Sequence, residues 1–264
     1  YADTGGAGAP LLCLAGLTRD SRDFGPLIPH LAGAYRLISM DYRGRGQSDW
    51  AKDAVVEYQI PVEGRDALEL LDHLGIERAV LVGTSRGGLI GIDLATRQPE
   101  RLSALVLNDI GPVIDLGGIQ FILSYLGRPL EFADFGAAAS MLMTVYGPSA
   151  PDLSHADWVA YARRSFADEQ GRPALSYDPK LRDAVEASIP DAPPDLWPLF
   201  DAIACPVLTL RGANSNILTA ETFAEMQARK PGMSAVEVPD RGHCPLLDEP
   251  ASLAALRAFL ESLT

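Results

Sequence analysis

The feature that most limits the fold is the stretch AVLVGTSRGGLI at residues 79–90. It begins with a short apolar run typical of a buried strand, continues through a Gly-x-Ser-x-Gly turn, and ends in an apolar run of helical character. A strand that turns so sharply into a helix needs small residues on both sides of the turn, and Gly83 and Gly87 meet that need. The stretch therefore predicts one strand, turn and helix unit of an α/β fold.

Short apolar runs bounded by glycine or polar residues recur along the chain and alternate with stretches of helical periodicity. Since helices that connect parallel strands cover both faces of a sheet, this alternation predicts a mostly parallel sheet with helices on both faces. The predicted strands are 11–15, 35–40, 79–82, 104–107, 207–210 and 235–238, and the predicted helices are 24–31, 62–74, 88–96, 220–228 and 250–263.

The alternation stops after residue 112 and resumes near residue 199. The residues between have helical patterning, scattered proline and glycine, and no convincing strand, which predicts a helical cap at 113–198 inserted into a core of 1–112 and 199–264. The insertion is rich in aromatic residues, which either roof a pocket or form a small core of their own. Trp158 and Trp197 are candidates for substrate contact.

Composition excludes several classes of partner and cofactor. In this chain of 264 residues acids exceed bases, 35 against 22, without a basic cluster, which disfavours nucleic acid and anionic membranes and favours a small-molecule substrate. No apolar run approaches the roughly 20 residues that span a bilayer. The segment Arg43-Gly44-Arg45-Gly46 lacks the third glycine of a dinucleotide-binding loop, and no P-loop lysine is present, so we expect no organic cofactor.

The cysteines indicate a reducing compartment. Cys13, Cys205 and Cys244 are odd in number and contain no CxxC pair, which supports neither a disulfide framework nor a zinc site. We therefore expect no metal and a cytoplasmic location. This expectation is limited because the chain begins at Tyr1 rather than Met, so that a signal peptide can precede it.

Ser85, at the centre of the turn, is the candidate nucleophile. The turn projects its hydroxyl from the end of the strand, and the helix that follows points its N-terminal dipole toward any anion that forms there. The backbone N–H of Arg86 is one expected oxyanion donor. The second is the N–H of Leu17, which follows the first predicted strand.

His243 is the candidate general base. It lies in a loop directly after the last predicted strand, which places it at the same sheet edge as Ser85. A neutral imidazole near pH 7 can take the serine proton and return it to a leaving group. The other histidines are expected to be solvated: His30, His73 and His155.

In combination these motifs resemble the α/β-hydrolase superfamily over essentially the whole chain. Other matching segments are MDYRGRGQSD at 40–49, LVLNDIGP at 105–112 and DRGHCPLLDEP at 240–250. The resemblance implies the α/β-hydrolase fold, and the inserted region is similar to the helical cap of that superfamily's esterases and carbon–carbon bond hydrolases. The chain departs from the family at Ala15-Gly16, where His-Gly is common.

The resemblance implies a serine hydrolase that acts on a carboxylic ester or lactone through an acyl-enzyme. A hydroxyl nucleophile suits acyl transfer, whereas dehalogenases and epoxide hydrolases of the superfamily use a carboxylate at the same place. Two alternatives stay open: a hydrolase of carbon–carbon bonds in diketone-like acids, and a non-catalytic ligand-binding protein on the same fold. The sequence indicates no oligomeric state.

The acid of the expected triad is the unusual position. In the segment LRGANSNIL at 210–218, Asn216 matches the family's triad acid residue for residue, and an amide carries no charge to stabilise an imidazolium. We favour a variant from which the acid has been removed. The alternatives are that Asp109, after the strand at 104–107, serves His243 instead of capping a turn, or that turnover has been lost.

Four further charged residues have structural interpretations. The Arg86 side chain could bind a substrate carboxylate, but we favour a pair with a neighbouring acid inside the fold. Asp240 is expected to be a turn residue because it is only three positions from His243. Asp248 and Glu249 precede the last helix, where carboxylates favour the N-terminus.

Overall fold

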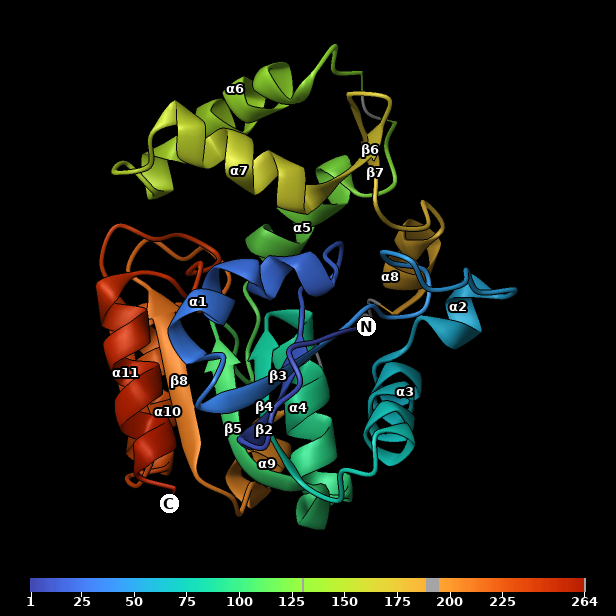
Figure 1. The fold of residues 1–264 in the computed structure, drawn as a ribbon. Coiled ribbons are helices and arrows are strands. Elements are labelled where there is room, and N and C mark those ends of the chain that lie inside the picture. Colours follow the sequence, from blue (N-terminus) through green and yellow to red (C-terminus); the bar gives the residue numbers. More distant parts are fainter. Residues whose placement is uncertain (130, 189–194, 264) are drawn as a thin grey trace.

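The computed structural model describes residues 1–129, 131–188 and 195–263, and within them seven strands form one sheet in the order β1-β3-β2-β4-β5-β8-β9 (Figure 1). Every neighbouring pair is parallel except β1 and β3. The fold class is therefore the predicted one. The strands are β1 Ala2–Asp3, β2 Ala9–Leu14, β3 Tyr35–Met40, β4 Ala79–Thr84, β5 Leu102–Asn108, β8 Val207–Gly212 and β9 Ser234–Val238.

Helices cover both faces of this sheet. Successive side chains of a strand point to opposite faces of the sheet. In β2, Leu12 and Leu14 therefore join one hydrophobic cluster while Leu11 and Cys13 join another. The first cluster includes residues of α3, α4, α9 and α10, and the second includes residues of η1, α1 and α11. The core helices are η1 Ser21–Leu27, α1 Ile28–Leu31, α2 Ala54–Glu57, α3 Ile60–His73, α4 Arg86–Arg97, η2 Pro99–Arg101, α9 Trp197–Ala202, α10 Ala220–Arg229 and α11 Pro250–Glu261.

The helix predicted at 24–31 is mostly a 3-10 helix. It begins earlier, at Ser21, and only its last four residues are α-helical. Pro26 lies inside the 3-10 segment and Pro29 inside α1. Because proline has no N–H to donate, two prolines so close together prevent a continuous α-helical ladder.

The segment 113–198 packs above one end of the sheet in Figure 1. It is mainly helical, but it also contains an antiparallel hairpin, so the expectation of no strand there was wrong. Each hairpin strand has only four residues, too few to show a clear alternation. Its elements are α5 Leu116–Tyr125, α6 Phe135–Tyr146, η3 Gly147–Ser149, α7 His155–Ser165, β6 Phe166–Glu169, β7 Arg172–Leu175 and α8 Leu181–Ser188, and α9 begins at its end.

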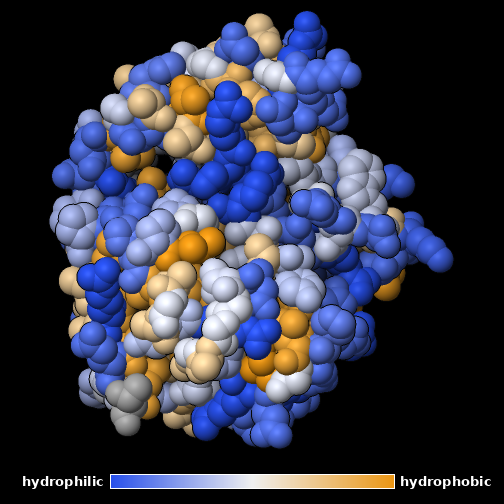
Figure 2. Space-filling view, viewed as in Figure 1, coloured by the Kyte–Doolittle hydropathy of each residue, from blue (hydrophilic) through white to orange (hydrophobic). Residues whose placement is uncertain are grey.

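The visible surface is mostly hydrophilic (Figure 2). Figure 2 shows mostly hydrophilic residues on the visible face, interrupted by separate hydrophobic patches. No helix in the described ranges is both long enough and apolar enough to cross a membrane.

The three cysteines are free thiols, and Cys13 is fully buried in the sheet, where burial raises the pKa of its thiol to about 12. The cytoplasmic location stays a prediction.

Candidate active site

Ser85 occupies the tight turn between β4 and α4. Its φ of 49° is unusual for a residue with a side chain. A Cβ on Gly83 would lie 2.5 Å from the backbone of Gly87, and a Cβ on Gly87 would lie 2.0 Å from the carbonyl oxygen of Leu14. Glycine is therefore required on both sides, for the steric reason that the sequence pattern indicated.

His243 lies between Ser85 and Asp109. Its Nε2 is 3.0 Å from Ser85 Oγ, and its Nδ1 is 2.7 Å from Asp109 Oδ2. The imidazole is 16% exposed and the Asp109 carboxylate is fully buried. The three side chains come from the ends of β4, β5 and β9, since the carboxyl ends of parallel strands meet at one edge of the sheet.

Asp109 is held by donors from the neighbouring strand β8. Its Oδ1 accepts a hydrogen bond from the N–H of Gly212 at 2.7 Å, and its Oδ2 accepts one from Ser215 Oγ at 2.6 Å. Its backbone has a φ of 57°, a conformation that aspartate adopts more readily than most residues. These contacts satisfy the buried carboxylate and aim its second oxygen at the histidine.

Asn216 does not take the place predicted for it. In the described parts of the chain the hydrogen-bond partner of His243 Nδ1 is Asp109, and a ring nitrogen offers only one such site. The strands β5 and β8 are neighbours, so the loops that follow them lie at the same edge of the sheet. Asn216 lines the adjacent cavity, while Ser215 donates to the Asp109 carboxylate. The preference for an acid-deficient site therefore does not fit this geometry.

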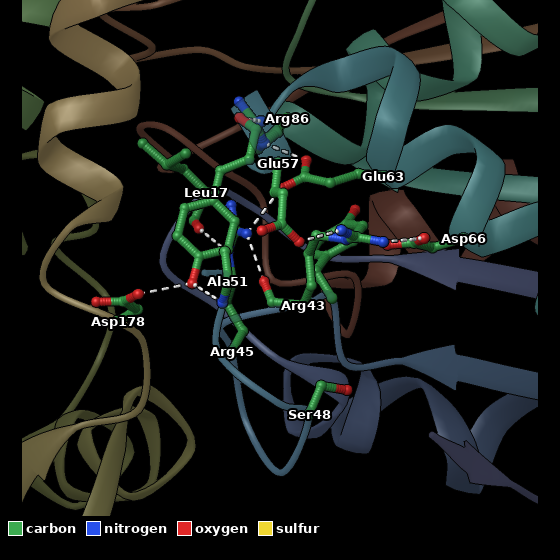
Figure 3. A network of polar contacts seen from close by, with 12 residues as sticks. Leu17, Arg43, Arg45, Ser48, Ala51, Glu57, Glu63, Asp66, Arg86 and Asp178 are labelled. Atoms are coloured by element: carbon green, nitrogen blue, oxygen red, sulfur yellow. Dashed lines mark hydrogen bonds and ion pairs between the residues drawn. The ribbon is translucent and has the colours of Figure 1, made fainter. Parts of the chain in front are cut away.

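The two expected oxyanion residues are connected by a buried charge network (Figure 3). Arg45 donates from Nε to the carbonyl oxygen of Leu17 at 3.0 Å and from Nη1 to Glu63 Oε1 at 2.7 Å. Arg86 donates from Nε to Glu63 Oε2 at 2.6 Å. Burial raises the pKa of Glu63, but the charges of Arg45 and Arg86 outweigh it and leave the pKa below its ordinary value.

The Arg86 side chain is thus paired inside the fold, as we favoured, and does not line the cavity. It also donates to the carbonyl oxygen of Tyr58 at 2.8 Å. The hydroxyl of Tyr58 donates to Asp178 Oδ2 at 2.7 Å, and Asp178 follows β7. The network therefore ties the core to the segment 113–198.

A cavity of about 600 Å³ lies beside Ser85 and His243. Leu17 and Asn216 belong to its wall on the core side. Most of its aromatic wall comes from the segment 113–198, as one interpretation of that segment predicted. These residues are Phe121, Tyr125, Tyr146, Tyr161, Phe166 and Tyr177.

Neither tryptophan proposed for substrate contact reaches the cavity. Trp158 is 3% exposed and packs in a separate cluster formed mainly by α6 and α7. Trp197, at the start of α9, contacts Phe200 and lies under the guanidinium of Arg229 at 4.4 Å. Both expectations were wrong because each ring fills a helix interface instead.

Asp240 and Glu249, two of the charged residues expected to be structural, lie in a turn and at the start of a helix. Asp240 has a φ of 53° in the turn after β9. Glu249 is the N-cap residue of α11, but its carboxylate accepts from Arg241 Nε, the N–H of Leu246 and Ser252 Oγ instead of from the first turn's backbone. Within the described ranges, no cluster of three or more acidic, histidine or cysteine residues could hold a metal ion.

Comparison with known proteins shows the family of the chain. The model of a family described as the alpha/beta hydrolase family matches residues 11–256. A 3-hydroxybutyrate-oligomer hydrolase of Cupriavidus necator is 38% identical over 260 residues, which are 94% of this chain and 87% of the relative. A 2-(acetamidomethylene)succinate hydrolase of Mesorhizobium japonicum is 27% identical over 244 residues, 90% of this chain and 82% of the relative.

Solved structures give the same result. An alpha/beta hydrolase from Novosphingobium aromaticivorans is 43% identical and superimposes with a TM-score of 0.89, covering 97% of this chain and 90% of that chain. The structure of E-2-(acetamidomethylene)succinate hydrolase superimposes with a TM-score of 0.82 over 97% of this chain and 92% of that chain. At 24% identity, this second likeness speaks for the fold alone.

Proposed function

Because this chain belongs to the α/β-hydrolase family, we propose that it is a serine hydrolase of carboxylic esters or lactones that works through an acyl-enzyme. The observation that carries the proposal is the unbroken pair of hydrogen bonds from Ser85 through His243 to Asp109. That arrangement supplies a nucleophile, a base within reach of its proton, and a carboxylate that orients the base.

The proposed reaction has two halves. Ser85 Oγ attacks the carbonyl carbon while His243 Nε2 takes the hydroxyl proton, and the electron pair of the C=O bond moves to oxygen. The tetrahedral intermediate collapses, the C–O bond to the alcohol breaks, and His243 returns the proton to the alcohol. Water then attacks the acyl-enzyme by the same route and releases the acid and Ser85.

The N–H groups of Leu17 and Arg86 are the proposed oxyanion donors. Arg86 is the first residue of α4, and the first N–H groups of a helix have no acceptor within it. The Arg45 and Glu63 side chains support both residues through the contacts described above, and the N-terminal dipole of α4 adds to the stabilisation of negative charge.

Asp109 is the proposed acid of the triad. Its charge would hold Nδ1 of His243 protonated, leave Nε2 free to accept the serine proton, and stabilise the imidazolium that forms. Two donors from the end of β8 keep its carboxylate in place. Asn216 then needs no catalytic role, and we propose that turnover is not impaired by its amide.

An ester is the proposed substrate because the relative at 38% identity is named for the hydrolysis of 3-hydroxybutyrate oligomers, and such oligomers are joined by ester bonds. In the alternative of carbon–carbon bond hydrolysis, an Arg86 side chain that binds a substrate acid would matter more. That guanidinium is occupied by Glu63 and Tyr58, so the alternative loses its support from this residue.

A fluorophosphonate probe tests the proposal. We expect it to phosphonylate Ser85, with the adduct located by peptide mass spectrometry, and we expect steady hydrolysis of nitrophenyl butyrate. The variants Ser85→Ala and His243→Ala should lose both signals while they keep the wild-type melting temperature. A folded wild-type protein that neither reacts with the probe nor cleaves any short ester would overturn the proposal. Cleavage of ring-fission diketones without cleavage of esters would move it to the carbon–carbon alternative.

A further inference from the structure

The charge of the cavity wall is opposite to that of the chain. The whole sequence has 35 acidic and 22 basic residues. Among the described residues, however, the wall includes three guanidinium groups, Arg19, Arg128 and Arg164, and a single carboxylate, Asp23. A positive lining in an acidic protein concentrates anions where the bulk of the surface repels them.

Arg19 is already neutralised by the fold. Its guanidinium donates from Nε to Asp23 Oδ1 at 2.9 Å and from Nη1 to Ser165 Oγ. It also lies over the ring of Tyr161, with its Cζ 4.6 Å from the ring centroid. Arg19 and Asp23 therefore form a fixed part of the wall and leave two cations to explain.

Arg164 is the more informative of these two. It is in the last turn of α7, and its Cζ lies 5.8 Å from the centroid of Tyr161, another wall residue. Within the described parts of the chain its buried Nε has no hydrogen-bond partner, and it forms no salt bridge. A buried donor without an acceptor costs free energy, so Arg164 is a cation that the fold leaves unsatisfied beside the cavity that it lines.

The neighbouring arginine shows that this situation is specific to Arg164. Arg163, on the same helical turn, points elsewhere: it is 60% exposed, lies 3.8 Å from Asp168 and stacks on the ring of Phe135. It does not line the cavity. The general preference of basic residues for the C-terminal end of a helix explains both arginines equally, but it does not explain the buried, unpartnered Nε of one of them.

The charge of Arg164 affects the pKa of the Asp248 carboxyl, but no hydrogen bond or salt bridge joins the two side chains in the described ranges. Burial and the charge of Glu249 keep the pKa of Asp248 above its ordinary value despite the opposing effect of Arg164. Arg128, after α5, is exposed, and its side chain has no partner among the described residues. Both guanidinium groups are thus available to a ligand.

We propose that the cavity takes esters that also carry a free carboxylate, and that Arg164, with Arg128 as a second cation, binds this carboxylate while Ser85 attacks the ester. A guanidinium presents its donors in a planar fork that matches the two oxygens of a carboxylate. The aromatic wall encloses the carbon chain between the two groups. The inference rests on the proposed esterase function and adds the charge of its substrate.

Matched substrates test the charge directly. Mono-nitrophenyl esters of adipate, pimelate and suberate would be compared with the esters of the corresponding monoamides, which have the same shape without the charge. For at least one length, we expect wild-type kcat/KM to be about tenfold or more higher for the acid than for the amide. The variant Arg164→Gln should lose this preference, mainly through a higher KM for the acid ester.

The control is Arg163→Gln on the same helical turn, which should keep the preference. Arg128→Gln should reduce it in part. Equal cleavage of acid and amide at every length by the wild type, or an equal loss on both substrates in Arg164→Gln, would overturn the inference. A preference that survives in Arg164→Gln and disappears in Arg128→Gln would also overturn the assignment to Arg164.

Binding separates this inference from the proposed function. Calorimetric titration of Ser85→Ala with adipate, pimelate and suberate should detect binding that weakens in the double variant Ser85→Ala, Arg164→Gln and at high salt. If the wild type cleaves no ester while this Arg164-dependent binding is found, the carboxylate site stands and the esterase proposal fails. If simple esters are cleaved while none of the diacids binds, the carboxylate site fails and the esterase proposal stands.

Discussion

The sheet core and the segment 113–198 contribute to one cavity in different ways. On the core side, the charged groups nearest the reacting serine are paired: His243 with Asp109, and Glu63 with both Arg45 and Arg86. On the other side, the segment contributes aromatic and aliphatic side chains to the wall, together with two guanidinium groups that form no salt bridge in the described ranges. Under the proposed function, the core would supply the reacting groups and the segment would select the substrate.

Among the variants that test this division between core and segment, Asp109→Asn is expected to have the largest effect on turnover. The amide keeps the size of the side chain but removes the charge and can hold His243 in the wrong tautomer, so kcat should fall by roughly 10⁴-fold with a nearly unchanged KM. Steady-state assays with nitrophenyl butyrate would measure kcat and KM, and thermal melting would establish that the variant is folded. A loss of less than about tenfold would show that another group supplies the acid.

Glu63→Gln should affect the stability of the core. It would leave the buried Arg45 and the mostly buried Arg86 without their shared counter-ion, and breaking a buried pair costs about 3–5 kcal/mol in the free energy of unfolding. Urea denaturation at neutral pH measures this loss. Because the pKa of Glu63 is lowered in the folded state, its contribution is fully present at neutral pH and is lost as the pH falls through that pKa.

The difference in the free energy of unfolding between wild type and Glu63→Gln should therefore be smaller at acidic pH. Glu57→Gln is the matched control, since Glu57 pairs with Arg43 at the partly exposed edge of the same network (Figure 3) and should cause a much smaller change. An equal effect of the two substitutions would show that burial of the pair is not what matters.

Phe121→Ala should change the preference for substrate chain length without slowing the reaction at the ester. The ring of Phe121 lines the cavity and packs edge-on against Tyr125 and Tyr146, with ring centroids 5.7 Å and 6.0 Å away. Removing it should raise KM for long acyl chains by about tenfold while kcat for acetate esters stays within about twofold. A similar fall in kcat for every chain length would contradict the division between core and segment.

The smallest effect is expected from Asn216→Asp. Since Asp109 already occupies Nδ1 of His243, a second carboxylate nearby should change kcat for neutral esters by less than about threefold. It would add negative charge to the cavity wall, so cleavage of carboxylate-bearing esters should fall more than that of neutral ones. A large rise in kcat would instead restore position 216 as the acid.

The core could be predicted from sequence because its signals are local. The turn around Ser85 is encoded by residues two positions apart, and the strand boundaries follow apolar runs that the structure reproduces to within a few residues. His243 could be found because a strand directly precedes its loop. Each of these inferences needs only neighbouring residues and the rule that parallel strands end at one edge.

The partner of His243 Nδ1 could not be predicted in this way. Asp109 and Asn216 both follow strands that end beside His243, and the sequence does not say which loop turns inward. The choice depends on Ser215 and Gly212, whose donors hold the Asp109 carboxylate across more than a hundred residues of chain. The tryptophans were misplaced for a similar reason, because periodicity does not tell which of two neighbouring helices a ring will contact.

The bond between Tyr58 and Asp178 has a consequence for how such proteins diversify. The acceptor for the Tyr58 hydroxyl comes from the segment 113–198 while the rest of the network belongs to the core, and this bond is one of several polar contacts that hold the segment on the core. A segment taken from a relative should dock correctly when it retains a carboxylate at this position. New substrate ranges can thus arise by exchange of whole walls, while the reacting groups beneath them are inherited unchanged.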